Sequence, residues 1–565
     1  MTDATGRYVD GNVAARLDIV GRLMDGAVAI AEAERRRSGP PVEGQTGTYR
    51  LCTFGELSRR SSVLARGFHH HGIGPGDRIV MLVPFGISFI TLVFAILKTG
   101  AEMVLIDPGM DRRHLVDCLS ETRPTGFVGI PKAHVARWWF RRRFPDATKN
   151  VAVGPRRFLG MRTLHQIEVT GRDAGSAKLP ERQRSDAAAI IFTTGSTGPP
   201  KGVAYTHGTF HSQIDRIADR YDIHRGSRDL ACFPLFGLFD AMMGVTAIIP
   251  DMDPTRPADI DPRKLIRAAE DWQADQAFGS PALWKTVVQW AEDRDIVGRP
   301  LHTLHRVLSA GAPVPASTLR SLRHLIAPEA DVHTPYGATE ALPIASIESR
   351  QILTHTGPAA EKGKGVCVGQ RFPTVRWKVI EVDDGPIATS EDWCELPTGK
   401  IGELVVSGPM VTERYVTRTD QNALHKVASD DGVWHRMGDV GYLDDDDRFW
   451  FCGRKAHRVP CGNRTLWTVP CEAIFNVDPE VIRCALIGIG SRPNQTPLMV
   501  IECADNVRTH PESRDRLIER LRDRAARNPL TRRIERFEIW PGSLPVDIRH
   551  NSKIFREKVA AHYER

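Results

Sequence analysis

From about residue 50 to residue 350, short apolar runs alternate with amphipathic segments. Within this region the pattern predicts a strand from Arg78 to Val83, a helix from Ile87 to Thr99 and a strand from Glu102 to Ile106. The stretch from Ile79 to Leu97 carries no charge over 19 residues, which is long enough to span a membrane. Because a proline and a glycine interrupt it and charged residues follow closely, we expect a buried βαβ unit instead. The alternation as a whole predicts an α/β fold.

The pattern changes after about residue 365, where short segments of alternating polarity follow one another. These predict a β-rich subdomain with strands at Val375 to Val382, Gly402 to Val406 and Arg448 to Cys452. A smaller α+β unit follows, with a helix from Arg514 to Arg527 and strands at Val481 to Ile487, Met499 to Cys503 and Ile534 to Trp540. The expected organisation is a helical N-terminal extension and linker (1–47), a large domain (48–453) and a small mobile domain (454–565).

The composition is that of an ordinary globular protein. The chain has 565 residues, with 76 Lys and Arg against 69 Asp and Glu, and much of the arginine lies in mixed-sign helical stretches. Such stretches are typical of solvated helix faces, so we expect no nucleic-acid partner. The 10 cysteines are scattered without metal-binding spacing, and no targeting sequence is visible. These observations predict reduced thiols, a cytoplasmic location and no transmembrane segment.

One short segment, Arg137 to Phe144 (RWWFRRRF), mixes aromatic residues with arginines. Such a mixture is able to contact a membrane surface or a hydrophobic substrate carrier. We favour the alternative interpretation of a partly buried helix whose arginine side chains reach past apolar neighbours to water.

The most informative motif is Thr193 to Gly202 (TTGSTGPPKG), which follows a predicted strand from Ala187 to Phe192. Glycines let the backbone approach a ligand closely, and N–H groups, hydroxyls and a lysine together bind polyphosphate. The spacing differs from the G-x-x-x-x-G-K-[ST] loop, because Lys201 is followed by Gly202. The alternative is a surface turn, which the preceding apolar strand disfavours.

Three later motifs carry groups that suit the rest of a nucleotide. Ser309 to Pro313 (SAGAP) predicts a small-residue turn with room for a planar base, and Thr334 to Glu340 (TPYGATE) combines an aromatic ring with a carboxylate suited to Mg²⁺. Arg436 to Tyr442 (RMGDVGY) places Asp439 in a glycine-flanked turn, where a carboxylate can accept both ribose hydroxyls. Near the C-terminus, Lys553 follows Asn551 and Ser552 in a polar loop ahead of a predicted helix from about Ile554. Taken singly, Asp439 has a plain alternative as a turn former, Tyr336 as a core aromatic and Lys553 as a solvated surface lysine.

In order and spacing, these motifs resemble the adenylate-forming superfamily of acyl-CoA synthetases, luciferases and adenylation domains, from about residue 50 to residue 558. The resemblance implies an adenylate-forming α/β fold that uses ATP and Mg²⁺. It implies catalytic roles for Lys553, Glu340 and Lys201. It implies nucleotide contacts from the phosphate loop (Thr193, Thr194, Gly195, Ser196, Thr197, Gly198), the adenine turn (Gly311, Ala312, Pro313), the stacking strand (Tyr336, Gly337, Thr339), the ribose aspartate Asp439 and the junction arginine Arg454.

Two positions depart from that family. Members that make thioesters often carry His or an aromatic residue where FPLFGLFD has Gly237, so thioester chemistry is in doubt and the wall of the acid pocket is expected to be opened. The residues expected to line this pocket are Phe233, Phe236, Gly237, Phe239 and Asp240, with ordinary core packing as the alternative. At the domain hinge, Ala456 stands where the family usually has Asp or Lys, with Lys455 beside it.

A closer resemblance rests on FPLFGLFD, the string IPDMDPTRPADIDP that follows it, and LPVDIRHN near the C-terminus. The chain is similar here to the β-lactone synthetases of long-chain olefin biosynthesis. This implies a long-chain 2-alkyl-3-hydroxy acid as substrate, activated as acyl-adenylate and closed to a β-lactone. It also implies a complex with other enzymes of such a pathway, which are thiolase-like, reductase and hydrolase-like. Asp240 and His435 are candidates, by position only, for the base that takes the hydroxyl proton.

Two other functions remain open. A fatty acyl-CoA synthetase would share the first half-reaction and then release AMP in a CoA-dependent step. A catalytically silent nucleotide-binding scaffold is the second alternative, and the presence of both Glu340 and Lys553 weighs against it.

Overall fold

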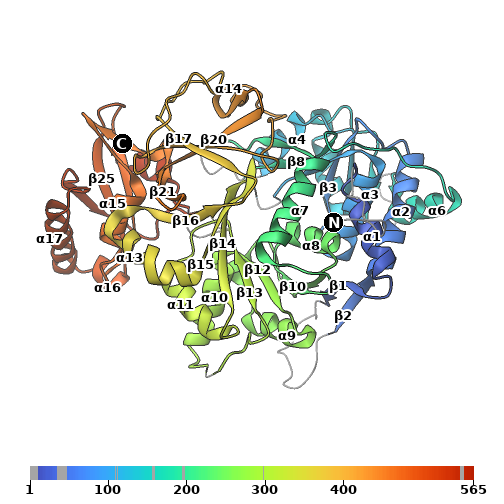
Figure 1. The fold of residues 1–565 in the computed structure, drawn as a ribbon, viewed down its shortest axis with the longest axis horizontal. Helices are drawn as coiled ribbons and strands as arrows, with labels where there is room; N and C mark the ends of the chain where they lie inside the picture. The colour runs from blue at the N-terminus through green and yellow to red at the C-terminus, as the bar shows by residue number, and fades with distance from the viewer. Residues whose placement is uncertain are drawn as a thin grey trace.

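The computed structural model describes residues 11–34, 48–107, 110, 112–154, 160–193, 198–296, 298–546 and 553–564. Two large β-sheets with helices packed around them make up the N-terminal part, and a smaller α+β unit lies at the C-terminal end (Figure 1). The observed elements therefore match the predicted mixture of α/β and β-rich regions.

The first sheet has the strand order β7-β6-β5-β3-β4-β8-β9. Its strands are β3 (Arg78–Leu82), β4 (Glu102–Leu105), β5 (Gly126–Gly129), β6 (Val151–Ala152), β7 (Arg162–Thr163), β8 (Ala187–Phe192) and β9 (Gly202–Thr206). The predicted βαβ unit is confirmed, because helix α3 (Ile87–Thr99) joins the parallel pair β3 and β4 and is buried from Phe89 onward. The flanking helices are α2 (Phe54–His70), α4 (Arg112–Glu121), α5 (Pro131–Trp139) and α6 (Leu164–Asp173). Of the helices that the structure describes, none is long and apolar enough to cross a membrane.

The second sheet begins with parallel strands, in the order β11-β10-β12-β13-β14. These strands are β10 (Arg228–Ala231), β11 (Thr246–Ile249), β12 (Gln276–Gly279), β13 (Arg306–Ser309) and β14 (Asp331–Ala338). The helices that connect or cover them are α7 (His207–Tyr221), α8 (Pro234–Met243), α9 (Pro262–Trp272), α10 (Pro281–Glu292) and α11 (Ala316–Leu325). Short apolar strands covered by helices are typical of parallel sheets.

The β-rich region continues the same hydrogen-bonded sheet with antiparallel strands. They are β15 (Ala341–Glu348), β16 (Val366–Arg371), β17 (Arg376–Ile380), β18 (Gly402–Ser407), β19 (Lys426–Ser429), β20 (Gly432–Leu443) and β21 (Arg448–Arg454). The short helices α12 (Ser349–Gln351), α13 (Gly357–Ala359) and α14 (Gln421–His425) lie in its connections. This continuity joins the predicted adenine turn after β13 to the predicted ribose aspartate on β20.

The N-terminal segment differs from the expected helical extension. Helix α1 (Ala15–Leu23) forms, but it is followed by strand β1 (Val28–Ala33), which pairs with β11 and with β2 (Tyr49–Thr53). Ala29, Ile30 and Ala31 are fully buried. The expectation is corrected here because this short apolar run lies between β11 and the edge strand β2 of the second sheet.

The C-terminal unit has its own hydrophobic core, built from residues after Arg458. Its strands are β22 (Val459–Cys461), β23 (Arg464–Leu466), β24 (Val481–Ile489), β25 (Thr496–Cys503) and β26 (Arg536–Ile539), and its helices are α15 (Thr468–Asn476), α16 (Asp505–Arg508), α17 (Pro511–Arg527) and α18 (Arg556–Tyr563). The long helix α17 lies at the outer end of the molecule (Figure 1).

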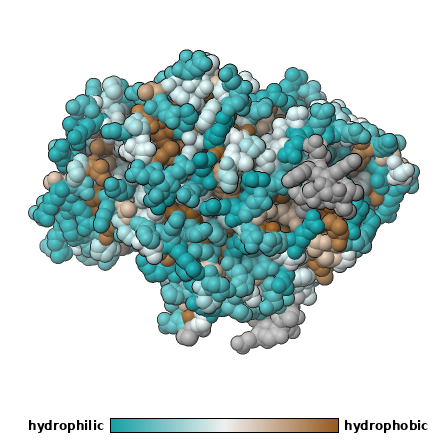
Figure 2. All heavy atoms as spheres, in the orientation of Figure 1, coloured by the Kyte–Doolittle hydropathy of each residue, from teal (hydrophilic) through white to brown (hydrophobic). Residues whose placement is uncertain are grey.

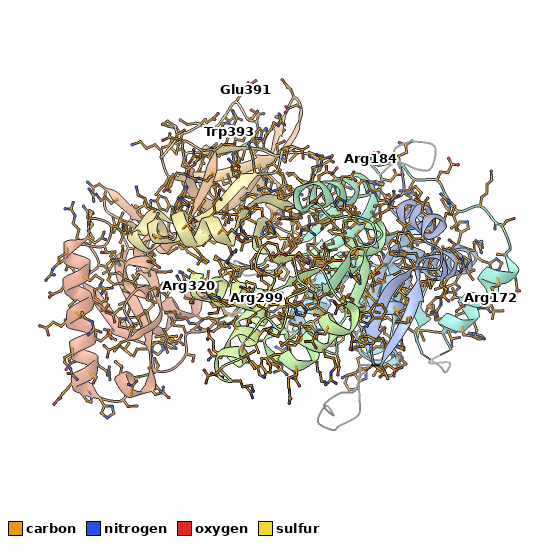
Figure 3. All side chains as sticks on the ribbon, turned by 60° about the horizontal axis from the view of Figure 1, so that its bottom comes forward. Arg172, Arg184, Arg299, Arg320, Glu391 and Trp393 are labelled. Carbon is orange, nitrogen blue, oxygen red and sulfur yellow. The ribbon has the colours of Figure 1, made fainter. Side chains whose placement is uncertain are left out.

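The visible surface is mostly hydrophilic, with smaller apolar areas between polar residues (Figure 2). Figure 3 shows that the labelled arginines come from separate segments, among them Arg172 of α6 and Arg320 of α11. The positive charge that they carry is therefore distributed over different parts of the molecule.

Candidate active site

The base of the predicted phosphate loop is closed by two hydrogen bonds between Thr193 and Lys201. The Thr193 N–H donates to the Lys201 carbonyl over 3.0 Å, and the Lys201 N–H donates to Oγ1 of Thr193 over 3.0 Å. Gly198 has φ of +150°, a conformation that favours glycine. The predicted phosphate contacts Thr194, Gly195, Ser196 and Thr197 lie outside the described residues. The loop thus leaves β8 and enters β9 with Lys201 at its closing end.

The ammonium of Lys201 lies in a partly buried polar cluster. Its Nζ is 4.9 Å from the centroid of the Tyr415 ring and 3.4 Å from Nε2 of His425. Burial lowers the pKa of Lys201, while the nearby Glu340 carboxylate opposes that shift. A cation held over an aromatic face and near a carboxylate is well placed for a polyphosphate.

Glu340 and Thr339 form the turn between β14 and β15, since Ala338 pairs with Ala341. Oε1 of Glu340 accepts a hydrogen bond from the Tyr415 hydroxyl over 2.7 Å. The Tyr205 hydroxyl donates to the Thr339 carbonyl over 2.6 Å, which ties this turn to the strand that follows the phosphate loop. One buried carboxylate beside a phosphate loop fits Mg²⁺, which is commonly held by few carboxylates together with phosphate oxygens and water.

Sequence reasoning missed three residues of this cluster, namely Tyr415, His425 and Lys426. Lys426 Nζ lies 5.5 Å from the centroid of the Tyr415 ring and donates to the Thr412 carbonyl. Burial lowers the pKa of Lys426 to about 7 and that of His425 to about 4. The adjacent His425 and Lys426 are the only local signal in the sequence.

Asp439 and Arg454, predicted to contact the ribose, are directly paired across strands β20 and β21. Nη1 of Arg454 donates to Oδ1 of Asp439 over 2.7 Å, and the Tyr336 hydroxyl donates to Oδ2 over 2.5 Å. The Asp439 carboxylate raises the pKa of Arg454, and burial with that same carboxylate raises the pKa of Tyr336. Because each carboxylate oxygen has a second lone pair, the group still has capacity for ribose hydroxyls.

The predicted adenine turn follows β13, which is parallel to β14 and pairs with it. Gly311 is exposed and has φ of +100°, so the turn needs glycine there, with Ala312 and Pro313 following. Tyr336 lies near the end of β14, and Gly337 after it has no room for a side chain, since a Cβ would lie 2.7 Å from the Ala341 carbonyl oxygen. The predicted adenine turn and Tyr336 therefore both lie at the carboxyl-terminal ends of two adjacent parallel strands.

The C-terminal helix approaches the domain junction close to Arg454. Nε2 of His457 lies 3.1 Å from Oε1 of Glu557, in the first turn of α18. Lys553 is half-buried four residues before Glu557, and Ile554 after it pairs with Val546. At the predicted hinge, Lys455 Nζ is 3.0 Å from Oε2 of Glu403, a carboxylate that is fully buried. Lys455 is therefore tied to strand β18 of the N-terminal part.

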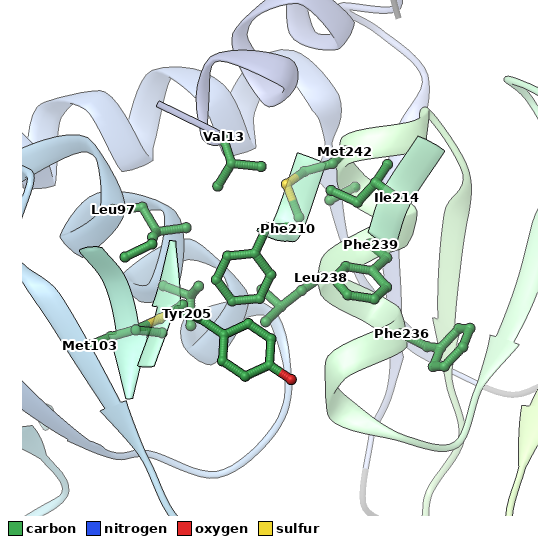
Figure 4. Packing of buried hydrophobic residues seen from close by; sticks show 14 of the residues in the cluster. Val13, Leu97, Met103, Tyr205, Phe210, Ile214, Phe236, Leu238, Phe239 and Met242 are labelled. Atoms are coloured by element: carbon green, nitrogen blue, oxygen red, sulfur yellow. The ribbon is translucent and has the colours of Figure 1, made fainter. Parts of the chain in front are cut away.

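Helix α8 and the preceding residue Phe233 carry the side chains predicted to line the acid pocket, and most of them pack in the core. The ring of Phe236 stacks on Phe278 with 3.6 Å between centroids, while Phe239 is completely buried and Phe233 partly so. Figure 4 shows Leu238 of this helix pointing toward Phe210 and Tyr205. The alternative of ordinary core packing therefore describes Phe239 well.

The expectation that Gly237 opens the pocket wall is corrected by the structure. A Cβ at Gly237 would lie 2.9 Å from Cζ of Phe85. The ring of Phe85 fills the space that a larger residue would take. The Phe85 ring also lines a small pocket. Ile249, Pro250 and Met252, from the start of the IPDMDPTRPADIDP string, line the same pocket.

The two candidate bases are both deeply buried. Burial and the neighbouring Asp229 carboxyl raise the pKa of Asp240 well above its usual range, and the side chain is fully buried. His435 is 2% exposed, and its Nδ1 lies 3.1 Å from the His425 carbonyl inside the β19–β20 hairpin. The structure thus gives both residues roles within the packed interior.

Comparisons with known proteins agree with this arrangement. Residues 31–416 match the family model described as AMP-binding enzyme. Two proteins named olefin beta-lactone synthetase, from Xanthomonas campestris pv. campestris and Stenotrophomonas maltophilia, are each 42% identical, with 97% of this chain and 97% of the relative covered.

Among solved structures, the ATP-bound MatB of Rhodopseudomonas palustris has a TM-score of 0.74 at 19% identity, covering 98% of this chain and 99% of that one. Its fold is therefore shared along nearly the whole length. Since the family model covers well over half of the residues, the chain belongs to the AMP-binding enzyme family and is an ATP-dependent, AMP-forming ligase.

Proposed function

We propose that this enzyme converts a long-chain 2-alkyl-3-hydroxy acid into a β-lactone by way of an acyl-adenylate. The observation that carries the proposal is the 42% identity to two olefin beta-lactone synthetases over 97% of the chain. The packing of Phe85 against Gly237 supports it, because the position where thioester-forming relatives often carry a large residue is occupied by a ring from the segment just before α3.

In the first half-reaction, a carboxylate oxygen of the acid attacks the α-phosphorus of ATP and pyrophosphate leaves. Lys201 lies at the end of the phosphate loop and Lys553 is proposed to reach the α-phosphate, so both stabilise negative charge that builds up on the phosphates. Glu340 would hold Mg²⁺, which supplies further positive charge to the phosphate oxygens when bound. Asp439 and Arg454 would orient the ribose, with Tyr336 beside the adenine.

In the second half-reaction, the β-hydroxyl oxygen attacks the activated carbonyl carbon of the same molecule. The carbon–oxygen bond of the lactone forms, the bond to AMP breaks, and the hydroxyl proton is released. A hydroxyl held against its own carbonyl has a large effective molarity, on the order of 10⁵ M or more in well-oriented cases. The apolar side chains of α8 would help to keep water from the adenylate.

The chemistry of this substrate implies earlier and later enzymes. A 2-alkyl-3-hydroxy acid arises when a condensing, thiolase-like enzyme and a reductase act before this one. A hydrolase-like enzyme and others of the same pathway are the partners that we propose for a complex.

The test uses a synthetic 2-alkyl-3-hydroxy acid and its matched 3-deoxy analogue, each with ATP, with and without CoA. The hydroxy acid should release AMP without CoA and give a product lighter by one water in mass spectrometry. The deoxy acid should stop after one turnover as bound adenylate. Rapid CoA-dependent conversion of both acids to thioesters would instead identify an acyl-CoA synthetase, and an absence of pyrophosphate exchange with either acid would identify a silent scaffold.

A further inference from the structure

The segment from Pro131 to Phe144 exposes a row of large apolar side chains. Trp139 is 75% exposed, Trp138 47%, Phe140 44% and Val135 43%. The segment is partly buried, as favoured from the sequence, since Phe144 is 5% exposed, but its other aromatic side chains lie on the surface. An apolar group of this size on a surface commonly marks a site of interaction.

The opposite side of the segment is firmly held, so the exposed row is fixed to the fold. His134 is buried, with Nε2 3.0 Å from the Val151 carbonyl oxygen. Phe144 is buried and meets the ring of Phe127 edge-on at 5.1 Å between centroids. Helix α5 thus presents its exposed side chains from an anchored position.

Positive charge surrounds these aromatic residues. The segment contains Lys132, Arg137 and the run Arg141–Arg143, and it contains no Asp or Glu. Arg141 lies 5.1 Å over the Trp138 ring, and Arg143 pairs with Asp117 at 2.8 Å. Arg142 is exposed and forms no ion pair with any described residue. We name Val135, Trp138, Trp139, Phe140, Arg141 and Arg142 the aromatic–arginine surface.

We infer that the aromatic–arginine surface docks the protein on an anionic lipid surface. Tryptophan and phenylalanine insert at the boundary between headgroups and acyl chains, and nearby arginines bind anionic headgroups. A second copy of this chain is a poorer occupant, because a symmetric contact would bring the arginine runs of the two copies together. An acidic protein would meet the charge, but the large apolar share of the surface fits a bilayer boundary better.

Docking of this kind has a consequence for the enzyme, which rests on the proposed function while the docking itself does not. Long-chain acids partition into bilayers. A protein held at the lipid surface therefore meets such a substrate at a far higher local concentration than in bulk water.

The test is co-sedimentation of the full chain with vesicles of phosphatidylcholine alone or with added phosphatidylglycerol, at low and high salt. Binding should need phosphatidylglycerol and weaken with salt. Two double variants, Trp138→Gln with Trp139→Gln and Arg141→Gln with Arg142→Gln, should each lower the partition coefficient roughly tenfold or more. The matched control joins Ile482→Gln, an apolar residue 55% exposed, to Arg320→Gln, and should bind like the parent.

Thermal melting and pyrophosphate exchange with a short, water-soluble acid should be unchanged in all variants, which shows that they fold. The inference is overturned if the parent does not bind the anionic vesicles, or if the double variants bind as well as the parent. Sedimentation velocity adds a further arm. A parent dimer that both double variants abolish, without vesicle binding, would assign the surface to a second copy instead.

Discussion

The ring of Phe85 packs directly against the backbone of Gly237 and fills the space that a side chain at position 237 would need. A Cβ at position 237 would come within 2.9 Å of Cζ and 3.3 Å of Cε2 of Phe85. Phe85 lies just before helix α3, and Gly237 lies in the first half of α8. The contact therefore connects the segment that precedes α3, beside the first sheet, with a helix of the second sheet, next to the predicted acid pocket.

We predict that Gly237→Val lowers activity toward the 2-alkyl-3-hydroxy acid by about tenfold or more, because the new side chain displaces the Phe85 ring. Overpacking of this kind typically costs about 1–3 kcal/mol. Combining it with Phe85→Ala should restore much of the activity, since the ring that is in the way is gone. Steady-state kinetics with the hydroxy acid measures both variants, and a Gly237→Val enzyme with parental kinetics would contradict the expected clash with Phe85.

The second prediction concerns Lys553, which we propose serves adenylation. Removing one charge-stabilising donor typically costs about 10²–10³ in rate. Lys553→Ala should therefore nearly abolish pyrophosphate exchange while ATP still binds in calorimetry.

Lys558→Ala is the matched control for this prediction, because Lys558 lies five residues after Lys553, on helix α18, and is exposed, with Nζ 4.7 Å over the Phe555 ring. It should retain exchange. Exchange within a few-fold of the parent in Lys553→Ala would show that another residue carries the charge.

Part of the candidate site's geometry could be anticipated from the sequence, because the motifs proposed to bind nucleotide are local, while their roles stay predictions. A glycine-flanked aspartate and an arginine at the end of the next strand face each other across one β-ladder, as the Asp439–Arg454 pair shows. Tyr415 and Lys426 could not be predicted, because they reach Glu340 only through the fold and lie 75 and 86 residues away in the chain. Strand β1 was missed because its apolar run follows a polar segment, and its partner β11 lies far along the chain.

The third prediction separates the roles of Asp439 and Glu340. Asp439→Ala should weaken ATP binding even without Mg²⁺, since it removes the proposed ribose acceptor and leaves Arg454 without its ion-pair partner. Glu340→Ala should chiefly change the Mg²⁺ dependence of adenylation. Tyr336→Phe keeps the ring and loses only the hydroxyl that bonds to Asp439, so its effect should be smaller than that of Asp439→Ala. Calorimetry with and without Mg²⁺ measures all three, and equal responses of Asp439→Ala and Glu340→Ala would refute the separate roles.

The last prediction follows from the buried amine of Lys426. Burial lowers its pKa to about 7 in the folded protein, while in the unfolded chain it is near the usual 10.4. Between these values the unfolded chain binds more protons, so this amine makes the folded state more stable as pH rises from 7 toward 10. The slope from one such group is at most about 1.4 kcal/mol per pH unit.

The variant Lys426→Met lacks this titrating amine. The free energy of unfolding of the parent minus that of the variant should therefore increase from pH 7 to pH 10. Lys378→Met serves as the control, because the Lys378 side chain is 37% exposed, and it should leave the pH dependence of the parent unchanged, as followed by urea unfolding at several pH values. A constant difference between the parent and Lys426→Met from pH 7 to pH 10 would mean that Lys426 stays charged in the folded protein, held by its carboxylate neighbour Glu340.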